Sequence, residues 1–124
     1  MSAGELGIAV QMLLKSHPGI ATSSSGHVAH VERYITKSGQ PIGLELRVMS
    51  FKNIWVRADS VRRHQLADID QQFYDHRTFD TSKPNHDLYG EHAFKGTDLI
   101  CFKVKELWQA VRVIAEVAEM KANS

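Results

Sequence analysis

The sequence has few of the residues that define specialised classes of protein. Its 124 residues include one cysteine and three prolines, and its longest apolar run, residues 99–102, has only four members. Because a helix needs about 18 apolar residues to cross a bilayer, we expect no membrane span. Cys101 cannot form an internal disulfide and lies in an apolar segment, so we expect a buried, unreactive thiol. The N-terminal residues show no cationic stretch before an apolar one, so we expect no secretory signal and a cytoplasmic location.

The chain also lacks a strong net charge, but its value of +1 conceals two opposed blocks. Residues 31–64 hold seven bases against three acids, and residues 65–98 hold seven acids against three bases. An asymmetry of this kind concerns partners rather than fold. The isoelectric point near 7.9 is below the basicity typical of a dedicated DNA-binding domain.

Hydrophobic periodicity predicts one small α+β domain over residues 1–124. Ser2 and Glu5 have capping-box spacing, and apolar residues then recur at helical intervals to about Lys15. A polar loop is expected over 21–26, strands over 28–36, 42–49 and 51–58, and a helix from Asp59 or Ser60 to Gln72. An irregular polar segment over 74–97 precedes a strand over 99–102 and a helix over 107–120. This order, α-β-β-β-α-(long loop)-β-α, predicts a mainly antiparallel sheet with helices packed on one face.

Strand alternation places a set of charged and aromatic residues on the face of the predicted sheet that the helices do not cover. Glu45 and Arg47 share one side of their strand, and Trp55 and Arg57 share one side of the next. With Arg33 on the neighbouring strand, this face combines cations that suit phosphate with a ring on which a base could stack. The alternative interpretation is that these charges form solvated cross-strand pairs and that Trp55 belongs to the core.

The first functional hypothesis is therefore a binding module for nucleic acid or another anionic ligand. The arginines would contact the anion, Trp55 would stack, and Glu45 would orient them. Tyr89 and His92 would come from the irregular segment if it folds over this face. Binding is favoured over catalysis, because no Gly-x-Ser-x-Gly or phosphate-cradling glycine motif is present.

The second hypothesis, of nearly equal weight, is a protein-interaction domain that forms a homo-oligomer. The basic block of one subunit would face the acidic block of another. The last helix offers a further dimer contact if Trp108 and Val113 are exposed.

A third hypothesis is enzymatic and rests on the order of the elements. Helix, three strands, helix and strand is similar to the core of PD-(D/E)xK-type nucleases, in which acidic residues on adjacent strands hold a divalent metal. Glu45, Leu46 and Arg47 occupy the place of the acid-x-lysine motif, and Glu32 is the acid available on the preceding strand. The resemblance therefore implies a catalytic group of Glu32, Glu45 and Arg47, in which arginine replaces the lysine.

A divalent metal site in the irregular segment is a fourth hypothesis. His86, Asp87 and His92, with His76 and Asp80, offer the ligand types that zinc and similar ions prefer. The spacing of the histidines matches no compact metal-binding signature. The sequence predicts no other cofactor.

Overall fold

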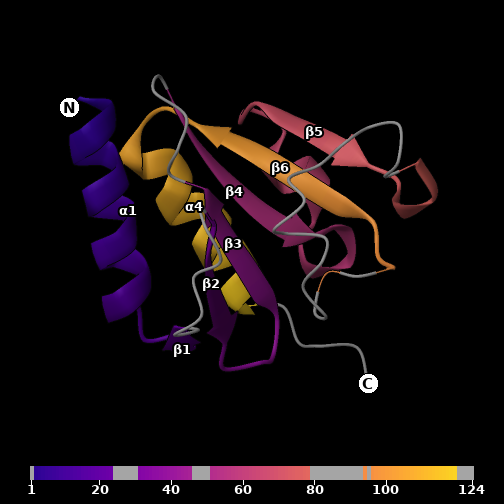
Figure 1. The fold of residues 1–124 in the computed structure, drawn as a ribbon, viewed down its shortest axis with the longest axis horizontal. Coiled ribbons are helices and arrows are strands. Elements are labelled where there is room, and N and C mark those ends of the chain that lie inside the picture. The colour runs from indigo at the N-terminus through magenta and orange to yellow at the C-terminus, as the bar shows by residue number, and fades with distance from the viewer. Residues whose placement is uncertain (1, 24–30, 46–50, 79–93, 95, 120–124) are drawn as a thin grey trace.

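The computed structural model describes residues 2–23, 31–45, 51–78, 94 and 96–119. These residues form two α-helices and a six-stranded antiparallel sheet, which confirms the predicted α+β class (Figure 1). The helices are α1 (Ala3–Ser16) and α4 (Leu107–Glu119), which lie near the two ends of the chain. The strands are β1 (Ile20–Ser23), β2 (Val31–Thr36), β3 (Pro41–Glu45), β4 (Lys52–Arg57), β5 (Gln71–Tyr74) and β6 (Leu99–Val104).

Helix α1 begins at the predicted capping box. The backbone N–H of Glu5 donates to the Ser2 hydroxyl at 3.1 Å, and the backbone N–H of Ser2 donates to the Glu5 carboxylate at 3.4 Å. These bonds satisfy donors that the first helical turn leaves without intrahelical partners. The helix ends at Ser16, before Pro18, because the proline ring excludes the residue ahead of it from helical geometry.

The strands lie in the order β1-β2-β3-β4-β6-β5, and every neighbouring pair is antiparallel. The chain therefore meanders through the first four strands and then places β6 between β4 and β5 (Figure 1). β4 and β6, in the middle of the sheet, pair along their whole length from Lys52–Val104 to Arg57–Leu99.

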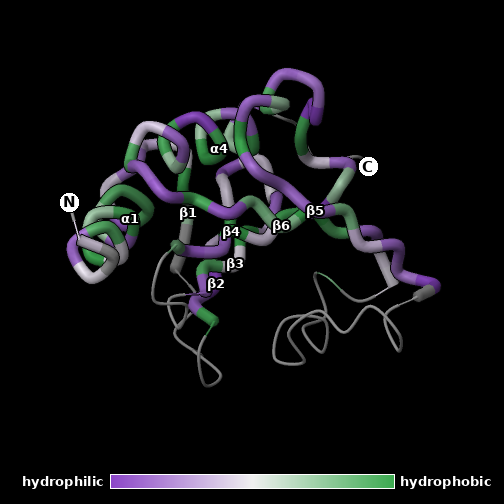
Figure 2. Tube along the Cα trace, turned by 90° about the horizontal axis from the view of Figure 1, so that it is seen from above, coloured by the Kyte–Doolittle hydropathy of each residue, from purple (hydrophilic) through white to green (hydrophobic). Residues whose placement is uncertain are grey.

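Both helices lie on the same side of the sheet (Figure 2), as the sequence predicts. Between them and the sheet is the main core, built from alternate residues of the strands and the apolar faces of the helices. Its fully buried members include Val10, Leu14, Ile42, Leu44, Ile54, Val56, Ile100, Phe102, Ile114 and Val117. This side of the sheet is covered, so a sheet-based binding site could lie only on the other side.

The predicted helix from residue 59 or 60 to Gln72 is wrong. The segment contains two short 3₁₀ turns, η1 (Ala58–Ser60) and η2 (Arg63–Leu66), followed by strand β5. The apolar residues Val61, Leu66 and Ile69 are all buried, but their spacings of five and three make no continuous helical stripe. Strand β5 forms because the free edge of β6 offers hydrogen-bond partners, a tertiary effect outside the local pattern.

Strand β1 lies partly where a polar loop is expected. Ile20 and Thr22 pair with Thr36 and Ile35 of β2, across a register irregularity. The alternation that predicts a strand is absent from Ile-Ala-Thr-Ser, so pairing with β2 determines its conformation. The strands expected over 28–36, 42–49 and 51–58 are found as β2, β3 and β4 within their described parts.

Candidate functional site

The sheet face opposite the helices carries the predicted ligand-binding residues that the structure describes. Arg33 pairs with Gly43, Gly43 with Trp55, and Trp55 with Cys101, so these residues form one row across the sheet. Glu45 pairs with Asn53 in the next row, and Arg57 pairs with Leu99 on the other side. Because alternate residues share a face, Arg33, Glu45, Trp55 and Arg57 lie on the same side of the sheet.

Trp55 is the centre of a second small core on this face. Its side chain is 3 % exposed and packs in a cluster with Val31, Phe94, Leu99 and Cys101. Tyr74 lies against the cluster, with its ring centroid 5.1 Å from that of Trp55. A ring that is almost completely buried offers no open face to a nucleic-acid base. The structure thus places Trp55 in the core, as in the alternative interpretation, and these contacts give its expected stacking role no support.

Glu45 is held by polar neighbours on the same face. Its Oε1 accepts hydrogen bonds from Nδ2 of Asn53 at 2.7 Å and from Nε1 of Trp55 at 3.2 Å. The indole N–H therefore has the partner that a buried tryptophan requires. Glu45 therefore serves as an acceptor for the polar groups of this small core.

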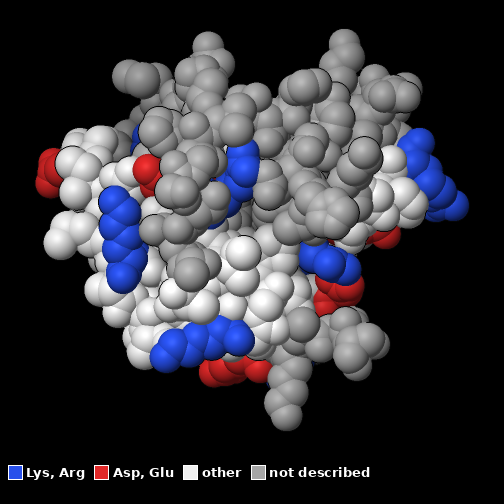
Figure 3. Space-filling view, turned by 60° about the horizontal axis from the view of Figure 1, so that its bottom comes forward, with Lys and Arg blue, Asp and Glu red and all other residues white. Residues whose placement is uncertain are grey.

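The charge of Arg57 is already compensated. Its Nε and Nη2 donate to the two carboxylate oxygens of Asp59 at 3.1 and 3.0 Å, a bidentate pair. Arg33 is half-buried within the same face. On the face that Figure 3 shows, the visible lysines and arginines of the described residues form separate groups, and acidic side chains lie beside several of them. The pairing of Arg57 with Asp59 favours charges that are already compensated over a continuous phosphate-binding surface.

Glu32 and Glu45, the described members of the nuclease-like group, are not brought together. Glu32 pairs with Leu44, one residue out of step with Glu45, so the two carboxylates project from opposite faces of the sheet. Glu32 lies on the helix side, where it accepts from the hydroxyl of Tyr34 at 2.8 Å and from Nε2 of Gln11 at 2.9 Å. Burial of the Tyr34 hydroxyl, together with its bond to Glu32, raises the pKa of Tyr34.

Six of the predicted site residues lie outside the described part of the chain. They are Arg47, Asp80, His86, Asp87, Tyr89 and His92. The metal site expected from His86, Asp87 and His92 therefore stays a prediction.

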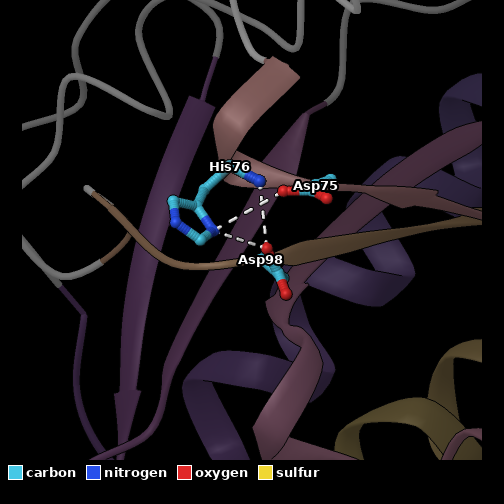
Figure 4. A group of neighbouring side chains, drawn as sticks. All are labelled: Asp75, His76 and Asp98. Atoms are coloured by element: carbon cyan, nitrogen blue, oxygen red, sulfur yellow. Dashed lines mark hydrogen bonds and ion pairs between the residues drawn. The ribbon is translucent and has the colours of Figure 1, made fainter.

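The described residues bring one group of metal-ligand types together, at the ends of β5 and β6 (Figure 4). Nδ1 of His76 lies 2.7 Å from Oδ1 of Asp98 and 3.8 Å from Oδ1 of Asp75. Both oxygens of Asp75 also accept from the guanidinium of Arg77, at 3.1 and 2.7 Å. These hydrogen bonds lower the pKa of Asp75 to about 2. Bonds from the backbone and ring of His76 lower the pKa of Asp98. We therefore interpret Asp75, His76 and Asp98, together with Arg77, as a network of paired charges.

Cys101 is buried in the second core, as the sequence predicts. Burial raises the pKa of its thiol to about 12. Since only the thiolate is a strong nucleophile, Cys101 is unreactive at neutral pH.

A site that the sequence does not single out lies beside the 3₁₀ turn η2. Here Arg63, His64, Ala67 and Gln71 line an open hollow of about 530 Å³. Nε of Arg63 donates to Oε1 of Gln71 at 2.8 Å, and the guanidinium carbon lies 5.3 Å from the centre of the Phe73 ring. No ion pair joins Arg63 to a carboxylate among the described residues.

The two arginines at the start of this turn have different roles. Arg62 donates through Nε to Oε1 of Glu116 at 2.6 Å and through Nη2 to Oε2 at 3.1 Å. The Glu116 side chain is only 9 % exposed, and its bonds from Arg62 lower its pKa. Arg62 therefore anchors the turn to α4, whereas Arg63 faces the hollow. The basic tripeptide Arg62-Arg63-His64 is the sequence signal that could have indicated this site.

Comparisons with protein-family models, curated proteins and solved structures find no match to the chain. Neither described helix has the length and apolar character needed to cross a membrane.

Proposed function

We propose that the protein is a binding module for a small phosphorylated ligand, held in the hollow beside η2. The observation that carries the proposal is the guanidinium of Arg63, which lies at the hollow with an amide and a ring as neighbours and no carboxylate among the described residues. The proposal keeps the anionic ligand that the sequence favours and moves its site from the sheet face to this turn.

The neighbours of Arg63 hold its side chain in a defined orientation. Nε2 of Gln71 donates to the backbone oxygen of Leu66 at 2.9 Å, and this bond fixes the direction of the amide. Oε1 of the same amide then accepts from Nε of Arg63, and the Phe73 ring lies against the guanidinium. With Nε engaged, the two terminal nitrogens are available to donate in parallel to two oxygens of a phosphate. A pre-ordered side chain loses less conformational entropy on binding.

Size and charge of the hollow also fit such a ligand. The hollow is open to solvent, and its volume of about 530 Å³ exceeds that of inorganic phosphate. His64 is exposed at the wall of the hollow and adds a second positive charge when it is protonated. The cytoplasm, which is the location that we expect from the sequence, supplies many phosphorylated metabolites.

Calorimetric titration at low ionic strength tests the proposal, with inorganic phosphate, adenosine monophosphate and a single-stranded oligonucleotide as probes. We expect phosphate and the mononucleotide to bind, and Arg63→Gln to weaken both by about tenfold or more. Arg77→Gln is the matched control, because Arg77 is exposed and already paired with Asp75. It should leave both affinities unchanged.

Three outcomes would contradict the proposal. The first is that neither phosphate nor the mononucleotide binds. The second is that Arg63→Gln and Arg77→Gln weaken binding equally. Binding of the oligonucleotide alone would replace the small ligand with nucleic acid. Raising the salt concentration should weaken the binding of all three probes, so salt dependence does not distinguish the ligands.

A further inference from the structure

The solvent-facing side of α1 carries four residues in a heptad-like pattern. Glu5, Ile8, Met12 and Lys15 are spaced by three, four and three residues, and all four are exposed. At 3.6 residues per turn they fall within an arc of about 80° on the helix surface. Spacings of this kind form the contact seam when two helices pack along their length.

The two apolar residues of this seam are unusually open to solvent. Ile8 is 60 % exposed and Met12 is 65 % exposed, more than the other exposed large hydrophobic residues of the described chain. Helix α1 lies at one side of the molecule, and no other labelled element covers its outer side in either view (Figures 1 and 2). Large apolar side chains that are exposed together mark interaction surfaces.

The order of the four residues along α1 indicates which partner binds the seam. The seam is symmetric about its midpoint, with Glu5 and Lys15 at equal distances from it and Ile8 and Met12 between them. We propose that a second copy of this chain docks on the seam, with its α1 antiparallel. A twofold axis through the midpoint places Glu5 against Lys15 of the partner subunit and Ile8 against Met12 of the partner subunit.

Charge complementarity selects this arrangement over the parallel one. A parallel pair would place Glu5 against a second glutamate and Lys15 against a second lysine, which repel. No described ion pair includes Lys15, so its ammonium is available to the partner. The interface consists of two 14-residue helices, so it lies at the small end of the range for specific complexes. We therefore expect a weak dimer in equilibrium with monomer.

Sedimentation equilibrium of the full chain over a range of concentrations measures this association. We expect Ile8→Glu to weaken it by about tenfold or more, since a charge then enters the apolar centre of the seam. Val111→Glu is the matched control, because Val111 is 44 % exposed on α4 and lies outside the seam. Circular dichroism verifies that each variant keeps its helices. A monomer at all concentrations, or equal weakening by the two variants, would overturn the proposal.

Charge exchange tests the antiparallel orientation. Glu5→Lys gives a seam with two lysines, and Lys15→Glu gives a seam with two glutamates, so each variant alone should dimerise less than the natural chain. Mixing the two places lysine against glutamate at both ends, and association should return to near its original strength. Because Glu5 also belongs to the capping box, the Lys15→Glu variant provides a measurement in which the cap is intact. Failure of the mixture to exceed both separate variants would exclude this orientation.

Discussion

Oε1 of Gln71 lies 2.8 Å from Nε of Arg63, and this hydrogen bond joins strand β5 to the turn η2. The amide of Gln71 is itself anchored on the backbone oxygen of Leu66. The arginine that we assign to ligand binding is thus positioned by a residue eight places later in the sequence.

Gln71→Leu should weaken phosphate binding, because Arg63 loses the acceptor that orients its guanidinium. We expect the affinity to fall by about threefold to tenfold, less than for Arg63→Gln, since the charge itself is retained. Calorimetric titration measures the change, and Gln72→Leu, on the exposed neighbouring residue, is the control. An effect of Gln71→Leu larger than that of Arg63→Gln would contradict a positioning role.

Glu116→Ala should destabilise the fold. Its buried carboxylate accepts two side-chain bonds and one backbone bond from Arg62, so its removal leaves these donors without their acceptor. We expect a loss of about 1 to 3 kcal/mol in the free energy of unfolding, measured by urea denaturation. Glu119→Ala is the control, because Glu119 is 72 % exposed and lies 4.0 Å from Arg62. A loss no larger than that of the control would show that this anchor contributes little.

Gly19 and Gly4 should respond oppositely to alanine. A Cβ at Gly19 would lie 2.8 Å from Cβ of Ala118, too close for two carbon atoms, so Gly19→Ala should cost about 1 to 3 kcal/mol. A Cβ at Gly4 meets nothing within 4 Å, and alanine favours the helix there by about 0.5 kcal/mol. Thermal unfolding of the two variants gives the signs. If Gly19→Ala leaves the stability unchanged, this result would contradict the close approach of Ala118 on α4 to Gly19.

Acid should remove the contribution of Asp75 to stability. Its pKa is about 2 in the folded protein, below the value of about 3.9 for an unfolded aspartate. The carboxylate therefore stabilises the fold above pH 4, and this contribution is lost as the pH falls toward 2. Urea denaturation of the natural chain and of Asp75→Asn should show a stability difference at pH 6 that decreases by pH 2. A difference that does not change with pH would contradict the pairing with Arg77.

The sequence predicts those parts of the fold in which local pattern and tertiary partners agree. The capping residues Ser2 and Glu5 begin α1, and the alternation of Ile54, Trp55 and Val56 divides β4 between two faces. The edge strands β1 and β5 could not be predicted in this way. Their conformation depends on pairing with β2 and β6, and the residues of these partner strands lie outside the local sequence of β1 and β5.

For the candidate site, the sequence predicts an anion-binding chemistry but not the residues that are free to provide it. Alternation correctly places Arg33, Trp55 and Arg57 on one face, but it gives no measure of how deeply that face is covered. Phe94 buries Trp55 from a distant segment, and Asp59 neutralises Arg57 from the following turn. Arg62 pairs with Glu116 on α4, whereas Arg63 has no carboxylate partner among the described residues, and the sequence alone does not distinguish these two adjacent arginines.

Heteronuclear NMR during a titration with inorganic phosphate tests the central claim most directly. If phosphate binds in the hollow, the largest saturable shifts will appear at the backbone amides of Arg63, His64, Ala67 and Gln71 and at the Nε–H of Arg63. These shifts will disappear in Arg63→Gln and persist in Arg77→Gln. Saturable shifts centred on Arg33 and Arg57 of the sheet face, or no saturable shifts at all, would contradict the assignment.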